Sequence, residues 1–181
     1  MGVATASEVL ELLLLKWINW MRRRGSWKMV ERAQAPHRLP EPYLERFYLL
    51  RIGRRADPFF ALFLHRFWSS DPDEPHDHPW PWGSLILTRG YRECGVDGIW
   101  HWRRPWAVRF RQAEVLHRVS LRESDRGRVW TLFWHGRRSR KWGFVTRGGW
   151  TSAEATGDQD QRQMRGWLLP RFVGEETADG G

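Results

Sequence analysis

The sequence predicts an all-β fold, one β-barrel domain preceded by a single helix. Between residues 43 and 150 the chain consists mainly of short apolar or alternating runs bounded by Gly, Pro, Asp and Ser, a pattern typical of strands joined by turns. Its 181 residues suit one domain with a buried core and short extensions. We therefore divide the chain into an N-terminal helix and linker (1–42), a barrel (43–150) and a loosely ordered C-terminal tail (151–181).

The first expected element is a helix over Val9–Met21. Thr5-Ala6-Ser7-Glu8 matches a capping box, and three arginines at 22–24 follow the apolar run, where the helix dipole favours cations. The run is too short to span a bilayer comfortably. We expect it to pack on the barrel or against a second copy of the chain, with a membrane-surface anchor as the less favoured alternative. Residues 26–42 contain three prolines and are expected to be a linker.

Strands are expected at each apolar or alternating run that follows. These runs lie at 46–52, 59–68, 84–87, 99–102, 106–111, 115–121, 129–134 and 142–145. The run 59–68 is nearly all apolar, as a central strand covered on both faces would be. Alternation in 106–111 places Val108 and Phe110 on one face and Arg109 and Arg111 on the other. This arginine row is either solvated or lines the mouth of the barrel.

Two histidines, His76 and His78, precede the 84–87 run with one residue between them. In an extended chain they point the same way, about 7 Å apart, while Asp77 faces away. Two imidazoles on one face can share a metal ion, and His117, 39 residues after His78, is the candidate for a third ligand. Two or three strands fit between the two motifs, as a barrel requires to bring them face to face.

These strings resemble a known family. The His-x-His, the Ser-Leu-Ile-Leu run that leads to Gly-Tyr, and the later His-Arg-Val look like the two metal-binding motifs of the cupin superfamily, which implies a double-stranded β-helix, or jelly-roll, barrel. His-Asp-His-Pro-Trp with Trp-Thr-Leu-Phe and Lys-Trp-Gly-Phe is similar to small uncharacterised cupin-like proteins of bacteria and phages. The resemblance covers about residues 43–150. The usual glutamate after the second histidine is absent, since residues 81–84 read Pro-Trp-Gly-Ser. The resemblance therefore implies a three-histidine site like that of thiol dioxygenases.

Other polar residues near these strings are candidates for substrate binding or support. Substrate-binding candidates are Arg89, Arg109, Arg111 and Arg118, which could hold an anionic group by paired hydrogen bonds. Tyr91 is the candidate acid or base, with packing as its other role. His65 lies on an apolar face and is interpreted as a hydrogen-bonded core residue, with support of the metal as the alternative for it and for His101. His37 and the acidic residues of 71–74 are expected to lie in solvated loops.

Composition narrows the function further. The net charge is +9, mostly from arginine, which favours anionic partners: nucleic acid, acidic lipid, or a small carboxylate or phosphate ligand. The 14 tryptophans favour a dense aromatic core or an aromatic-walled pocket. Of these partners we expect a small anionic substrate. We expect a metal-dependent cupin, a non-haem Fe(II) dioxygenase-like enzyme, with zinc, nickel or manganese as other metals. The alternatives are a metal-dependent isomerase, epimerase or lyase, and a nucleic-acid-binding or regulatory cupin. The arginines are scattered and no nucleic-acid signature is present.

Cysteine content and the N-terminal sequence bear on the compartment. Cys94 is the only cysteine, so no intrachain disulfide can form. The N-terminal apolar run lacks a basic stretch before it and a cleavage site after it. We therefore expect a cytoplasmic protein, with a homodimer as one way to cover the helix.

Overall fold

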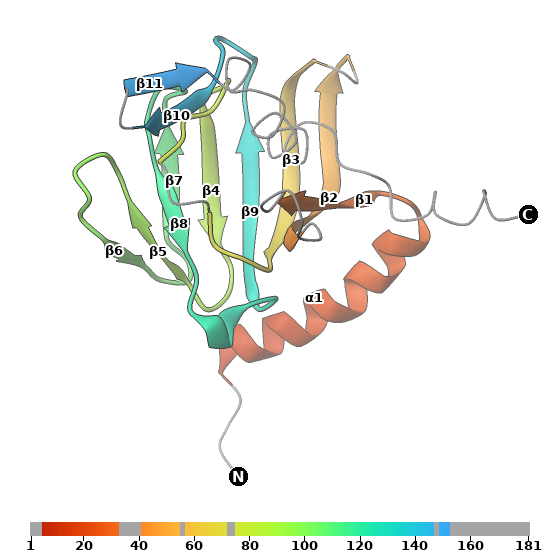
Figure 1. Ribbon diagram of the computed structural model, residues 1–181. Coiled ribbons are helices and arrows are strands. Elements are labelled where there is room, and N and C mark those ends of the chain that lie inside the picture. Colours follow the sequence, from red (N-terminus) through yellow and green to blue (C-terminus); the bar gives the residue numbers. More distant parts are fainter. Residues whose placement is uncertain (1–4, 33–40, 55–56, 72–74, 147–148, 153–181) are drawn as a thin grey trace, which may run out of the picture.

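The structure is a computed structural model that describes residues 5–32, 41–54, 57–71, 75–146 and 149–152 (Figure 1). One helix, α1 (Ala6–Arg23), is followed by strands and a short 3₁₀ turn. The strands are β1 (Trp27–Arg32), β2 (Glu41–Gly53), β3 (Pro58–Phe67), β4 (Trp82–Ile86), β5 (Tyr91–Cys94), β6 (His101–Arg103), β7 (Val108–Arg111), β8 (Arg118–Ser120), β9 (Val129–His135), β10 (Gly143–Thr146) and β11 (Gly149–Ser152), with the turn η1 at Glu123–Asp125. The prediction of an all-β fold with an N-terminal helix is confirmed.

Six strands form the larger sheet, in the order β1-β2-β3-β9-β4-β7, and every neighbouring pair is antiparallel. The interior strand β3 is buried on both faces, as its apolar sequence predicts. Phe63 projects to one side and Leu64 to the other, and each is under 5% exposed. The larger sheet therefore has two covered faces, which differ in what covers them.

A second layer covers the inner face of this sheet. It contains β6-β5-β8 and the β10-β11 hairpin. The segment at His76 joins these two parts, because His76 forms antiparallel bridges with both His117 and Phe144. One core cluster contains Leu44 and Ile86 from the larger sheet and Val119 from β8, so the two layers pack against each other.

Helix α1 covers the outer face. Ile18 and Met21 pack against Phe47, Leu64 and Trp130 of the sheet, and Figure 1 shows the helix lying across the ends of β2, β3 and β9. The expected capping box is present at the start of the helix.

Part of α1 remains exposed. Leu12 and Leu13 on its far side are 61% and 58% exposed. Among the residues that the structure describes, no helix is both long and apolar enough to cross a membrane.

The expected linker contains a strand that we did not predict. β1 pairs with β2 over Trp27–Arg32, and Val30 is completely buried between the layers. Its charged neighbours and the prolines beyond it hide the alternating pattern of this strand in the sequence. His37 and all of the expected tail beyond Ser152 lie outside the described residues.

Candidate metal centre

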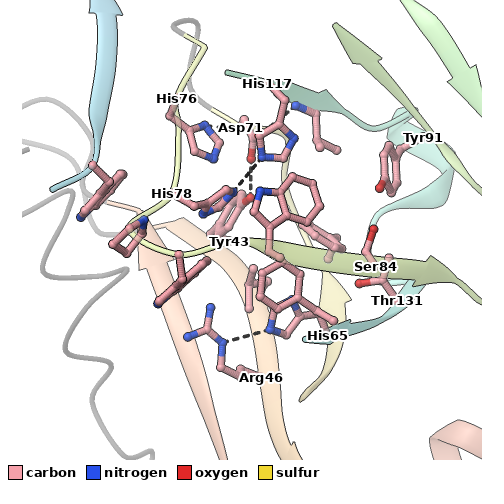
Figure 2. A pocket seen from close by; sticks show the side chains of 18 residues that line it. Tyr43, Arg46, His65, Asp71, His76, His78, Ser84, Tyr91, His117 and Thr131 are labelled. Atoms are coloured by element: carbon pink, nitrogen blue, oxygen red, sulfur yellow. Dashed lines mark hydrogen bonds and ion pairs between the residues drawn. The ribbon is translucent and has the colours of Figure 1, made fainter. Parts of the chain in front are cut away.

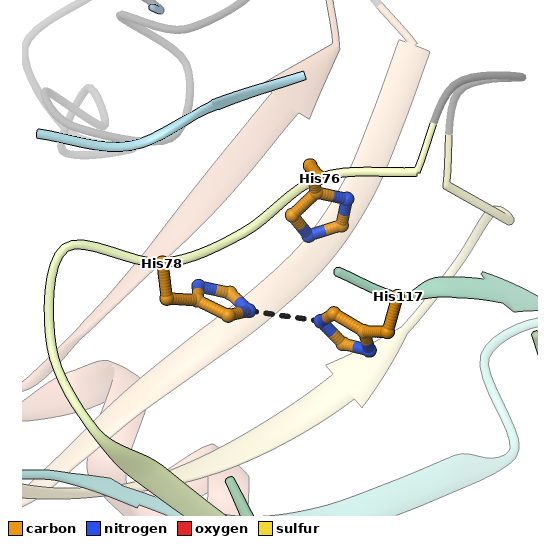
Figure 3. Close-up of side chains that lie close together, drawn as sticks. All are labelled: His76, His78 and His117. Atoms are coloured by element: carbon orange, nitrogen blue, oxygen red, sulfur yellow. Dashed lines mark hydrogen bonds between the residues drawn. The ribbon is translucent and has the colours of Figure 1, made fainter. Parts of the chain in front are cut away.

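Strand register brings the three predicted histidines together. The His76 N–H donates to the His117 carbonyl at 3.0 Å, and the His117 N–H donates back to the His76 carbonyl at 2.9 Å. Directly opposed residues project to the same face, and His78 shares that face because it lies two residues after His76. The three ring centroids are 4.8 to 5.2 Å apart (Figure 3). The predicted meeting of His76, His78 and His117 is thus present in the structure.

The donor atoms of these rings fit a metal ion. One nitrogen from each ring lies within 4.8 Å of the others, and the Nε2 atoms of His78 and His117 are 2.9 Å apart. Two nitrogens this close need a proton or a cation between them. Burial lowers the pKa values of His76 and His78 well below the usual range, with a further contribution from His117. Neutral imidazoles with available lone pairs are the form that binds divalent transition metals.

Glu93 supports His117 from behind. Its Oε1 lies 3.3 Å from His117 Nδ1, and its Oε2 is 2.8 Å from Arg103 Nε. Burial raises the pKa of Glu93, but contacts with His117 and Arg103 outweigh it and lower the value to about 2. A charged carboxylate at Nδ1 favours a proton there, which leaves the Nε2 lone pair for a metal.

Asp71 lies behind His76. Its Oδ2 is 4.0 Å from His76 Nδ1, its Oδ1 accepts from the Tyr43 hydroxyl, and its Oδ2 accepts from the Val119 N–H at 2.6 Å. Burial raises the pKa of this carboxyl group. The prediction of a solvated loop is wrong for Asp71, which is 4% exposed, because the loop folds back to pair with β8 through the Asp71 N–H and the Val119 carbonyl.

The histidines open on a cavity of about 80 Å³ between the two layers (Figure 2). Its walls include Trp80, Trp82, Trp142 and Phe133, and the ring of His78 stacks on Trp80 with centroids 5.0 Å apart. The expected aromatic-walled pocket is therefore present. Tyr91 also lines it, and burial raises the pKa of its hydroxyl, so that group stays protonated at neutral pH.

The four arginines predicted to bind substrate do not line this cavity. On β7, Arg109 and Arg111 face inward, whereas Val108 and Phe110 are 46% and 71% exposed. Both guanidinium groups lie 3.9 Å from Glu93, so they stabilise the carboxylate behind His117.

The other two arginines have different contacts. Arg89 pairs with Glu11 of α1 at 3.1 Å, and the Arg118 guanidinium lies over the Trp100 ring. None of the four predicted arginines is among the residues that line the cavity.

The other two candidate histidines, His65 and His101, differ in burial and in their contacts. His65 is buried, lines the cavity, and accepts a hydrogen bond at Nε2 from Arg46 Nε at 3.0 Å, as expected for a hydrogen-bonded core histidine. His101 is exposed on β6. Asp77 faces away from the cluster as predicted, with its carboxylate bound by Gly143 N–H and by Trp150 Nε1.

Sequence reasoning missed two charged groups at this site. Glu93 lies two residues after Tyr91, so strand alternation placed both on one face, and that signal was available. Arg46 also lines the cavity, but its neighbours Glu45 and Phe47 give no pattern that identifies the inward face.

Comparison with known proteins gives matches only among solved structures. No protein-family model and no curated protein matches the chain. KdgF from Halomonas sp. is 15% identical, with a TM-score of 0.41 over 55% of this chain and 84% of that one. A candidate mannose-6-phosphate isomerase from Ralstonia eutropha JMP134 is 17% identical, with a TM-score of 0.44 over 57% and 93%. Hydroxypropylphosphonic acid epoxidase from S. wedmorenis is 15% identical, with a TM-score of 0.40 over 53% and 51%.

The expectations drawn from the cupin resemblance can be compared directly with the structure. The fold is mostly antiparallel β-structure in two packed layers, and the histidines of both motifs meet in one cavity between them. These are the two features that the resemblance implied for the fold and for the site.

Proposed function

We propose that the protein is a metal-dependent enzyme that converts a small anionic molecule at the His76, His78 and His117 site. The observation that supports this most directly is the convergence of three buried imidazoles on one cavity. Three protein ligands leave coordination positions for other molecules, the arrangement that separates catalytic metal sites from closed structural ones.

Iron(II) is the metal that we propose, with zinc, nickel or manganese as alternatives. Fe(II) held by three protein ligands with open positions supplies oxygen activation, the chemistry of non-haem iron oxygenases. We therefore propose a dioxygenase-like reaction. The same ligands without redox chemistry would serve an isomerase, an epimerase or a lyase, so the identity of the bound metal separates these classes.

Residues around the histidines have distinct roles in this proposal. Trp80, Trp82 and Phe133 exclude bulk water from the cavity, which strengthens electrostatic interactions inside it. Glu93 holds a proton at His117 Nδ1 and orients the ring. Tyr91 keeps its proton at Oη and serves as a hydrogen-bond donor rather than as a base.

The basic composition does not require a nucleic-acid partner. Several arginines are engaged by buried carboxylates, with Glu11 contacting Arg89 and Arg128, and Glu45 contacting Arg22 and Arg66. These ion pairs give part of the positive charge a structural role. Oligonucleotide binding that weakens with salt and persists with a chelator would favour the nucleic-acid alternative.

Metal content tests the proposal. We expect His78→Ala to lower the metal bound per folded protein at least about tenfold, since it removes one ligand of three. Elemental analysis of protein purified without an affinity tag measures this, and circular dichroism confirms the fold. His101→Ala, on an exposed histidine, is the matched control and should keep its metal. Equal metal content in wild type and His78→Ala would contradict the proposal.

A further inference from the structure

One row of side chains crosses the inner face of the larger sheet. Lys28 of β1 pairs with Arg46 of β2, and Arg46 pairs with His65 of β3. Directly paired residues project to the same face of a sheet, and Val30, two residues after Lys28, is buried between the layers. The row therefore faces the second layer. Figure 2 shows Arg46 and His65 joined at one end of the pocket, with His76 and His117 toward the other.

The Arg46 guanidinium is held in place with donors to spare. Its Nε donates to His65 Nε2 at 3.0 Å, and it lies 4.9 Å from the centre of the Phe63 ring. Burial, and then the charge of Arg46, lowers the pKa of His65 well below its usual value, so the ring remains a neutral acceptor. Among the described residues the two Nη groups have no hydrogen-bond partner, and they form a pair of parallel donors, the geometry that matches a carboxylate or a phosphonate.

Arg46 and Lys28 differ in their partners from several arginines of the fold. Within the described part of the chain, no carboxylate lies within ion-pair distance of either one, whereas Arg22, Arg89 and Arg103 each reach a carboxylate. Asp71 lines the same cavity, but its oxygens accept from the Tyr43 hydroxyl and the Val119 N–H instead.

When no ligand is bound, this arrangement of cations lowers the stability of the folded protein. Lys28 and Arg46 are directly opposed like charges, which destabilise a strand pair. Burial and then the charges of Arg46 and Arg51 lower the pKa of Lys28 to about 7. A cation lining an apolar cavity also loses hydration that no carboxylate here replaces. An anion bound at Arg46 would offset both costs.

We propose that Arg46, oriented by His65 and reinforced by the charge of Lys28, binds the anionic group of the substrate. The substrate is then a small organic oxyanion, a carboxylate or a phosphonate, whose remaining atoms occupy the cavity between Arg46 and the three histidines. The cavity of about 80 Å³ favours a small molecule. This assignment rests on the proposed function and replaces the four arginines that the sequence suggested.

Small probe anions test this assignment. Acetate and methylphosphonate are titrated against the metal-loaded protein at constant ionic strength, with acetamide as the neutral counterpart of acetate. Tryptophan fluorescence reports binding, because Trp80, Trp82 and Trp142 line the cavity. We expect at least one anion to bind wild type more tightly than acetamide does, and Arg46→Met to weaken that binding about tenfold or more, as loss of a charge-assisted hydrogen bond implies.

Arg92→Met is the matched control, since Arg92 is exposed on β5. It should bind the probes as wild type does. If Arg46→Met fails to fold, Arg46→Lys keeps the charge but loses the paired donors, and it should lose most of the preference for the anion. The thermal shift of wild type gives a measurement that needs no variant: acetate or methylphosphonate should raise the melting temperature more than acetamide does.

The outcomes separate this assignment from the proposed function. Metal-loaded wild type that does not distinguish either anion from acetamide, or Arg46→Met that retains the distinction, overturns the anion site and leaves the metal enzyme standing. Wild type that binds no metal overturns the proposed function. Arg46-dependent anion binding by such metal-free protein would still support the anion site.

Discussion

The arginines under helix α1 and the Lys28–Arg46 pair lie on opposite faces of the six-stranded sheet and differ in their carboxylate partners. On the outer face, under α1, the carboxylates Glu11 and Glu45 are each shared by arginines. On the inner face, Lys28 and Arg46 oppose each other with no carboxylate within ion-pair distance among the described residues, beside the three clustered histidines. The outer-face arginines are neutralised within the chain, whereas the proposed anion would neutralise the pair on the inner face.

We therefore assign a stabilising role to the outer face of the sheet and a chemical role to its inner face. Alternate residues of the same strands supply both faces: Glu45 and Phe47 of β2 project toward α1, while Arg46 projects toward the cavity. The aromatic and aliphatic contacts of the outer face can hold the strand register. That register in turn sets the positions of the inward groups, which are unfavourable for stability when considered alone.

The largest expected effect concerns the outer face. Trp130 is completely buried against Phe47 and Leu64, so Trp130→Ala should lower the free energy of unfolding by about 3–5 kcal/mol, the usual loss for a large core residue. Chemical denaturation measures this. Because Trp130 projects away from the histidines, the metal bound per folded molecule should not change. Trp100→Ala, on a 40% exposed side chain, is the control and should have a small effect.

Two buried carboxylates, Glu93 and Glu45, allow the inner and outer faces to be compared directly. Glu93→Gln should weaken metal binding about 10- to 100-fold, because the charge that orients His117 is lost. Glu45→Gln removes a carboxylate that is also buried and also paired with arginines, but on the outer face. It should lower stability and leave metal affinity unchanged. A competition titration with a metal chelator measures both variants, and equal losses of affinity would remove the distinction between the faces.

A further effect is a pH dependence of stability that arises on the inner face. The pKa of Lys28 is lowered from 10.5 to about 7, first by burial and then by Arg46 and Arg51. Between these two pKa values the unfolded chain holds a proton that the folded chain lacks, so stability should rise with pH across this window. The slope cannot exceed about 1.4 kcal/mol per pH unit, the limit for one proton.

Lys28→Met isolates that contribution. Denaturation curves at pH 6.5, 8 and 9.5 should show a flatter pH dependence for the variant than for wild type. The variant should also be the more stable protein near pH 7, because the repulsion with Arg46 is removed. A pH dependence equal to that of wild type would show that Lys28 titrates normally. The Lys28 amino group also lies 5.3 Å from the centre of the Tyr48 ring. A methionine at this position can still contact that ring, so the substitution keeps this packing.

Local patterns were enough to predict the helix, the interior strand and the shared face of two of the three clustered histidines. The capping box at Thr5 and the apolar run that became β3 depend on neighbours within a few residues. His76 and His78 follow from strand alternation alone. β1 was missed because its pattern is short and its burial comes from pairing with β2.

The charged groups around the site were harder to predict, since their roles depend on contacts distant in the sequence. Arg109 and Arg111 were correctly placed on one face of β7, but the sequence did not show that Glu93 would neutralise that face. Asp71 was predicted to lie in a solvated loop, because the sequence did not show that it would pair with Val119 of β8. In each case the residue type showed that the side chain could carry a charge, but the sequence did not show which residue it would contact.

The sequence by itself determined which residues can bind a metal and which segments form strands, because both depend on residue type and short-range periodicity. Only the tertiary structure decided which cations find carboxylates and which face the cavity without one. Ion pairing depends on distances between strands far apart along the chain, and one residue of register moves a side chain to the opposite face. Arg46 therefore became a candidate for substrate binding only once its position beside His65 was known.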